Sequence, residues 1–221
     1  MTIWPGSRRG SVRKPTPIPT SCSGHRNNSS RRVPPKRKAA SGARIRSKWS
    51  APDAATGSWW RMNSEDFRRA LSPYPPSGLV FVGLGNPMRR DDGAGPVFLD
   101  RLAASKWFPA SHFIDAGVNP ENHLQHILDA QPEAVVLIDS ARFPAPPGTI
   151  AWLEREALDR IRISTHAFSM VLVENYLKAQ REMDFYYLAI RPESTDFTEG
   201  LTRSVRNGIE QFFGKSVAPG D

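Results

Sequence analysis

Residues 78–102 read GLVFVGLGNPMRRDDGAGPVFLDRL, and this stretch decides the fold. Its first apolar run, Leu79–Val82, is too short for a helix and is rich in residues that suit a buried strand. Glycines and a proline in Gly83–Pro87 predict a turn after this strand. Apolar residues then return at helical spacing and predict a helix from about Gly93 to Ser105. Strand, glycine turn and helix in this order are typical of an α/β domain, which places its functional side chains at the carboxyl edge of a parallel sheet.

The same alternation continues along the rest of the chain. Short apolar runs predict further strands at 112–117, 134–139, 148–153 and 185–190. The residues of 148–153 alternate well enough to predict a strand with one face more exposed to solvent. Helical patterns follow at 119–130, after Ser164-Thr165-His166, and at 198–213. The pattern after His166 has an apolar period of about 3.6 that runs through Phe168, Val171, Leu172, Asn175 and Tyr176. We therefore expect a three-layer α/β fold with a mostly parallel, twisted sheet of about five strands flanked by helices.

Charge divides the chain into two parts. Residues 1–77 hold 16 Lys and Arg against 3 Asp and Glu, and residues 78–221 hold 14 against 19, so the net charges are +13 and −5. The first part is rich in Pro, Ser and Arg and lacks sustained apolar periodicity, which predicts a disordered extension without a core. We then expect an α/β domain over 78–215 and a short tail over 216–221. An alternative is a misassigned gene start, with Met62 as the true first residue.

Composition also restricts the partners and the compartment. A basic extension attracts phosphates without needing a fold, so it allows non-specific contact with nucleic acid, which is otherwise not expected as a partner. No apolar run approaches the roughly 20 residues that span a bilayer, so no membrane partner is expected. The single cysteine, Cys22, excludes an intramolecular disulfide and favours a reducing compartment, which predicts a cytoplasmic protein.

Three polar residues stand at the places where an α/β sheet keeps its chemistry. Asp92 follows the glycine turn, Asp139 ends the most apolar strand, and His166 lies at the entrance of a helix. All three are loop positions on one sheet edge, so they can converge although 47 and 27 residues separate them along the chain. Two carboxylates and an imidazole suit a divalent transition metal such as zinc or nickel. The ordinary alternatives are a turn or cap role for each aspartate, with Asp91 as the ligand in place of Asp92, and a structural histidine.

Other chemistries fit the sequence less well. A dinucleotide site of the G-x-G-x-x-G type is disfavoured because Met88 occupies the third glycine position. A cysteine or serine nucleophile is not expected, since Cys22 lies in the extension and no G-x-S-x-G motif occurs. Gly83–Pro87 also resembles the start of peptidyl-tRNA hydrolases, but the catalytic histidine of those enzymes has no counterpart between Met88 and Pro96.

A different family resembles the chain over about residues 79–213. The pattern G-x-G-N-x-x-x-x-D-D-G-x-G over Gly83–Gly95 is similar to the opening motif of the nickel-iron hydrogenase maturation endopeptidases. Further blocks follow in the order of that family: IDAG at 114–117, LIDSA at 137–141, PGT at 147–149, STH at 164–166 and LAIRPE at 188–193. Ala189 departs from the pattern, because the family commonly has glycine there, and residues 1–77 have no counterpart.

The resemblance implies a fold, a reaction and a site. It implies a phosphorylase/hydrolase-like sheet and a protease that removes the carboxyl-terminal extension from the hydrogenase large-subunit precursor after nickel insertion. Asp92, Asp139 and His166 match the residues with which the family recognises nickel, and Asp115 matches a further acidic position. Nickel then belongs to the substrate precursor, and zinc or cadmium could replace it in a structure. Cleavage could use metal polarisation of the carbonyl, an activated water or an aspartate as general base. A non-catalytic nickel-binding module on the same fold remains the alternative.

Overall fold

The computed structural model describes residues 59–160 and 167–214. In chain order the elements are β1 (Trp59–Arg61), α2 (Ser64–Leu71), η1 (Pro76–Gly78), β2 (Leu79–Leu84), η2 (Arg90–Gly93), α3 (Ala94–Ser105), β3 (His112–Gly117), η3 (Pro120–His123), α4 (Leu124–Asp129), β4 (Ala134–Ser140), β5 (Ile150–Leu153), α5 (Arg155–Arg160), α6 (Ala167–Gln180), β6 (Asp184–Ile190) and α7 (Arg203–Phe212). The strands form one sheet in the order β1-β5-β6-β4-β2-β3. Strands β3, β2, β4 and β6 are parallel, whereas β5 runs antiparallel to both of its neighbours. The predicted α/β sheet is confirmed, with six strands instead of about five.

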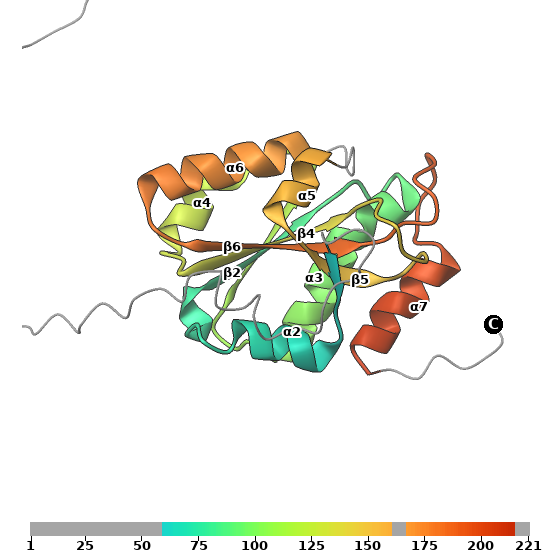
Figure 1. Ribbon diagram of the computed structural model, residues 1–221, viewed down its shortest axis with the longest axis horizontal. Helices are drawn as coiled ribbons and strands as arrows, with labels where there is room; N and C mark the ends of the chain where they lie inside the picture. Colours follow the sequence, from blue (N-terminus) through green and yellow to red (C-terminus); the bar gives the residue numbers. More distant parts are fainter. Residues whose placement is uncertain (1–58, 161–166, 215–221) are drawn as a thin grey trace, which may run out of the picture. The chain divides into compact units, whose positions relative to one another are not determined.

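Helices cover both faces of this sheet. Helices α4, α5 and α6 lie on one face, and α2, α3 and α7 lie on the other (Figure 1). Side chains alternate between the two layers along each strand, so Phe81 and Val136 join the core under α3 while Val82 and Leu137 join the core under α6. Strands β2 and β4 are buried along their whole length, as expected for the centre of a sheet with helices on both sides.

The glycines of the first motif allow helix α3 to approach the strand ends closely. A Cβ atom on Gly95 would lie 2.1 Å from the carbonyl oxygen of Leu84 and 2.5 Å from that of Ile138. Gly85 has a φ of +138°, and a Cβ atom there would lie 1.8 Å from the carbonyl oxygen of Asp92. The first turn of α3 is therefore pressed against the carboxyl ends of β2 and β4, and only glycine leaves room for that approach.

Residues 59–77 belong to the folded domain, so the boundary expected at residue 78 is wrong. Strand β1 pairs with β5, with Trp60 opposite Trp152. Helix α2 contributes Phe67, which is fully buried and packs against Phe81 and Trp152 among other rings. A short segment can belong to a core without a long apolar period when a few large rings supply the buried area. Residues 1–58 lie outside the described residues, and their expected disorder stays a prediction.

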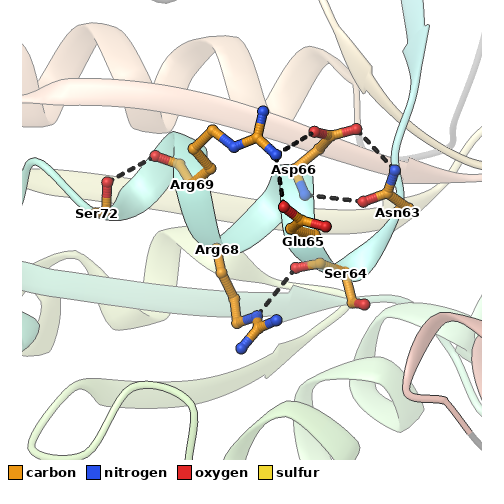
Figure 2. A network of polar contacts seen from close by, with 7 residues as sticks. All are labelled: Asn63, Ser64, Glu65, Asp66, Arg68, Arg69 and Ser72. Atoms are coloured by element: carbon orange, nitrogen blue, oxygen red, sulfur yellow. Dashed lines mark hydrogen bonds and ion pairs between the residues drawn. The ribbon is translucent and has the colours of Figure 1, made fainter.

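Helix α2 also carries the local signals of a stable helix. Asn63 is its N-cap: the side-chain Oδ1 accepts a hydrogen bond from the N–H of Asp66 at 2.8 Å, and the side-chain amide donates to the Asp66 carboxylate at 2.7 Å (Figure 2). Arg69 forms ion pairs with Glu65 and Asp66 one turn earlier (Figure 2). Beyond the helix, the Tyr74 hydroxyl donates to Asp184 at 2.5 Å and contacts the Tyr186 hydroxyl, which fastens the segment to the start of β6.

Two further expectations needed correction. Residues 150–153 form a strand, but all four are buried instead of alternating, because helices cover both faces of β5 and β1 covers its outer edge. Helix α6 exists as predicted, but the face that the apolar period predicted to be buried is partly exposed. Leu172 and Tyr176 are 52% and 47% exposed, whereas Val173 and Leu177 are buried in the core. The buried face of α6 also includes a glutamate, Glu174, and that charge conceals the true period in the sequence.

Candidate functional site

Asp92 lies in the segment that follows β2 and the glycine turn, just before helix α3. It is buried in the 3-10 segment η2, and its Oδ2 accepts the backbone N–H of Asn86 at 3.0 Å. The N–H of Asp92 in turn donates to the carbonyl oxygen of Arg89, and the Asn86 side chain accepts the N–H of Met88. The turn thus holds the carboxylate in a fixed position immediately before helix α3.

Asp91 has a structural role, which removes it as the alternative ligand. Its carboxylate is fully buried and accepts the backbone N–H groups of Glu193, Ser194 and Thr202 at 2.7 to 3.1 Å, as well as the Thr202 hydroxyl. These donors occupy both oxygens and join η2 to the loop between β6 and α7. The acidic pair therefore divides its tasks: Asp91 fastens the loop, and Asp92 remains the candidate for chemistry.

Asp139 stands at the end of the neighbouring strand β4. It is buried, and its Oδ1 accepts the N–H of Ser140 at 2.7 Å. Because Leu137 and Ala141 both join the core under α6, the alternation of the strand places Asp139 on that same face. Gly83 of β2 is paired with Ile138, and Gly95 packs against both strand ends, so the segments that carry Asp92 and Asp139 meet at the first turn of α3.

The third predicted residue, His166, lies outside the described residues. Helix α6 begins at Ala167, the next residue, and covers the face of the sheet on which Asp139 lies. Within residues 59–160 and 167–214, no three His, Cys, Asp or Glu side chains are grouped closely enough to hold a metal ion. The convergence of Asp92, Asp139 and His166 therefore stays a prediction.

Asp115 occupies a different environment from the other two aspartates. It lies in the edge strand β3 opposite Gly83, is exposed, and accepts the N–H of Gly117 at 3.0 Å. Ile114 and Ala116 on either side of it join the core under α6, so Asp115 faces the opposite side of the sheet from Asp139. The structure gives Asp115 a contact within its own turn, and its part in the reaction stays a prediction.

A buried carboxylate in the middle of α6, which the sequence analysis did not single out, joins this helix to its neighbours. Glu174 accepts Arg155 Nε at 2.6 Å and Lys178 Nζ at 2.5 Å, and the Tyr187 hydroxyl donates to it. Burial acts to raise the pKa of Glu174, but the hydrogen bonds and charges of these partners outweigh it, and the pKa lies below its ordinary value. Glu174 therefore remains ionised and ties α5, α6 and β6 together. A lone glutamate in the apolar run AFSMVLVENYL was the available signal.

Comparisons with known proteins identify the family of the chain. The sequence model of a family described as hydrogenase maturation protease matches residues 99–217, more than half of the chain. The hydrogenase 3 maturation protease of Escherichia coli strain K12 is 27% identical over 140 residues, which cover 61% of this chain and 85% of that protein. No helix within the described residues is both long and apolar enough to cross a membrane.

Solved structures show the same fold. The [NiFe] hydrogenase maturation protease HycI from Thermococcus kodakarensis KOD1 superposes with a TM-score of 0.58 at 24% identity, covering 66% of this chain and 93% of that one. The maturating endopeptidase HybD from E. coli superposes with a TM-score of 0.52 at 21% identity, covering 61% and 86%. The family resemblance seen in the sequence motifs is confirmed. On the match of the family model and the shared fold, the chain belongs to the hydrogenase maturation protease family and is a peptidase.

Proposed function

We propose that this protein removes the carboxyl-terminal extension of a nickel-iron hydrogenase large-subunit precursor after nickel has been inserted. The observation that carries the proposal is a pair of buried carboxylates: Asp139 lies near the carboxyl end of β4, and Asp92 lies in η2, which follows the adjacent strand β2. Each accepts a backbone N–H, which fixes the direction of its carboxylate. Such oxygens, with the imidazole of His166, suit a divalent transition metal ion held by the substrate's own ligands.

Recognition of this kind explains why cleavage would follow nickel insertion. The nickel ion is part of the substrate, and an empty precursor lacks the group that the two carboxylates and the imidazole would bind. The metal can polarise the scissile carbonyl when it is bound, and an aspartate can hold or take a proton from water. The charged residues of this chain thus contribute substrate recognition and the positioning of the attacked bond. We also place the protein in the cytoplasm, where a chain with a single cysteine needs no oxidising environment.

Incubation of the purified protein with nickel-loaded and with nickel-free precursor tests the proposal. We expect the wild-type protein to shorten only the loaded precursor, as measured by mass spectrometry. Asp92→Asn, Asp139→Asn and His166→Ala should each reduce the rate at least about a hundredfold, because each removes a ligand of the recognised metal. Full activity of any of the three variants contradicts the assignment of that residue.

The same experiment separates the alternatives. A non-catalytic nickel-binding module would bind the loaded precursor in a pull-down and leave its mass unchanged. A peptidyl-tRNA hydrolase would instead release peptide from peptidyl-tRNA, and that result would replace the maturation proposal.

A further inference from the structure

Three arginines lie at the carboxyl edge of the sheet. Two of them are close in sequence to the site aspartates, and the third follows strand β6. Arg89 precedes Asp92 by three residues, Arg142 follows Asp139 by three residues, and Arg191 directly follows β6. Arg89 Nη2 donates to the carbonyl oxygen of Thr195 at 3.3 Å, and Arg142 Nη2 donates to the hydroxyl of the same threonine at 3.4 Å. The first two guanidinium groups therefore meet at one residue of the loop between β6 and α7.

The third arginine lies close to this pair. Arg191 Nε donates to the carbonyl oxygen of Phe143 at 2.8 Å, which fixes its guanidinium beside the segment that follows Arg142. Burial, and then the charge of Arg142, lower the pKa of Arg191 from its ordinary value. The two positive charges are thus near enough to repel each other.

These charges are not neutralised within the described part of the chain. Arg69, Arg101 and Arg155 each form an ion pair with a glutamate. In contrast, none of Arg89, Arg142 and Arg191 has a carboxylate within ion-pair distance among the described residues, although the adjacent loop carries Glu193, Asp196 and Glu199. A cluster of like charges without partners on an otherwise acidic domain is a site for an external anion.

An apolar contact lies in the same loop. Phe197, two residues after Thr195, is 76% exposed. No other large apolar side chain among the described residues is as exposed. Met88, the neighbour of Arg89, is 44% exposed. Aromatic residues and arginine are the types enriched at protein interfaces, so the combination indicates a polypeptide ligand and not a small inorganic ion.

We propose that Arg89, Arg142 and Arg191 bind the carboxylates of an acidic segment of the protein substrate, with Phe197 as the apolar contact beside them. The inference rests on the proposed function, because a precursor that reaches Asp92 and Asp139 must lay its adjoining segment over this edge. Charge-assisted hydrogen bonds from a guanidinium to a carboxylate supply affinity and also fix the register of the bound segment. The segment bound here is therefore the part of the precursor that flanks the cleavage position.

Charge reversal at Arg142 tests this binding. We expect Arg142→Glu to raise the KM for nickel-loaded precursor about tenfold or more and to change kcat less than about twofold, since the substitution affects ground-state binding. Phe197→Ser should also raise KM. The matched control is Arg181→Glu: Arg181 is also exposed and donates to the carbonyl oxygen of Pro132, but that contact lies at the opposite, amino edge of β4. The control should behave as wild type, and circular dichroism should show all three variants folded.

A charge swap and a binding measurement complete the test. Lysine in place of the acidic residues of the precursor segment should weaken cleavage by the wild type and restore it with Arg142→Glu. Fluorescence anisotropy with a synthetic peptide of that segment, and with its Asn and Gln analogue, measures binding without cleavage. The inference is supported if the wild type binds the acidic peptide more tightly than its analogue and Arg142→Glu does not. If that result is obtained but no precursor is cut, only the proposed function fails. Equal binding of both peptides, an unchanged KM for Arg142→Glu, or an equal effect of Arg181→Glu overturns the inference.

Discussion

Asp91 and Asp92 are adjacent, yet the structure assigns them different tasks, and this difference can be measured. Asp91→Ala removes a buried carboxylate and leaves the N–H groups of Glu193, Ser194 and Thr202 without their acceptor. We expect a loss of about 2 to 4 kcal/mol in the free energy of unfolding, because several hydrogen bonds to one charged, buried carboxylate are lost together. Urea unfolding followed by circular dichroism measures the loss.

The control for Asp91→Ala is Asp92→Asn, which retains an oxygen to accept the Asn86 N–H. It should change the unfolding free energy by less than about 1 kcal/mol and affect cleavage instead. The assignment of tasks is wrong if Asp92→Asn is the more destabilising of the two variants.

Glu174 gives the stability of the protein a pH dependence of known sign. Its folded pKa lies below the ordinary value, so its ionised form adds stability above the unfolded pKa, and this contribution is lost as pH falls through the folded pKa. Glu174→Gln should cost about 1 to 3 kcal/mol at pH 7, and the difference from wild type should shrink below about pH 4.5. Urea unfolding at several pH values between about 3.5 and 7, at constant ionic strength, measures this difference.

The control for Glu174→Gln is the same substitution at Glu121, which is exposed. Glu121→Gln should leave the unfolding free energy within about 0.5 kcal/mol of wild type. A Glu174→Gln effect that is the same at every pH would show that its packing, and not its charge, stabilises α6.

At the scale of elements, the glycine motif forms a turn and also allows helix α3 to pack closely against the strand ends. Gly95→Ala would place a methyl group 2.1 Å from the Leu84 carbonyl oxygen and 2.5 Å from that of Ile138, so α3 must move away from the ends of β2 and β4. We expect a loss of about 3 kcal/mol or more, measured by thermal and urea unfolding, because backbone atoms cannot give way cheaply.

Gly78→Ala is the control for this effect of close approach. Its nearest neighbours are side-chain atoms of Glu133 and Pro75 at 3.2 Å, which can shift by a few tenths of an ångström. It should cost less than about 1 kcal/mol. Similar losses at Gly78 and Gly95 would contradict the argument from the close contact of α3.

The elements also show what the sequence can and cannot predict. The strands at 79–84, 112–117 and 134–140 follow from short apolar runs, and their order along the chain places Asp92 and Asp139 on one edge. The inward face of α6 was missed because Glu174 is buried there with Arg155 and Lys178 as partners, and a pattern of apolar residues cannot represent a buried ion pair. Such partnerships depend on tertiary contacts between α5 and α6, which no local period contains.

At the scale of the whole molecule, charge and fold have different boundaries. Residues 1–58 hold 13 Lys and Arg against 1 Asp, so a chain from residue 59 onward has a net charge of −4. The composition break suggested an extension that ends at residue 77, but Phe67 and Tyr74 lie in the core just after the basic stretch. Composition averages over a window, and a few buried rings in a polar segment do not change that average.

Truncation tests where the folded domain begins. A chain that starts at residue 59 keeps every contact that β1 and α2 make within the described residues, and we expect its unfolding free energy to lie within about 1 kcal/mol of the full-length protein. A chain that starts at residue 78 loses Phe67, whose ring contacts Phe81, Phe98, Phe108, Trp152 and Phe212. Removal of that ring alone costs about 3 to 5 kcal/mol, so the shorter chain should lose its cooperative thermal transition.

A start at Met62 separates the contribution of β1 from that of α2. This chain keeps α2 but loses the pairing of Trp59–Arg61 with β5, which exposes the outer edge of that strand. It should keep a cooperative thermal transition, unfold at a lower temperature than the chain from residue 59 and self-associate more readily, as measured by calorimetry and light scattering. If the chain from residue 78 unfolds at the same temperature as the full-length protein, β1 and α2 are dispensable attachments and the domain begins where the composition changes.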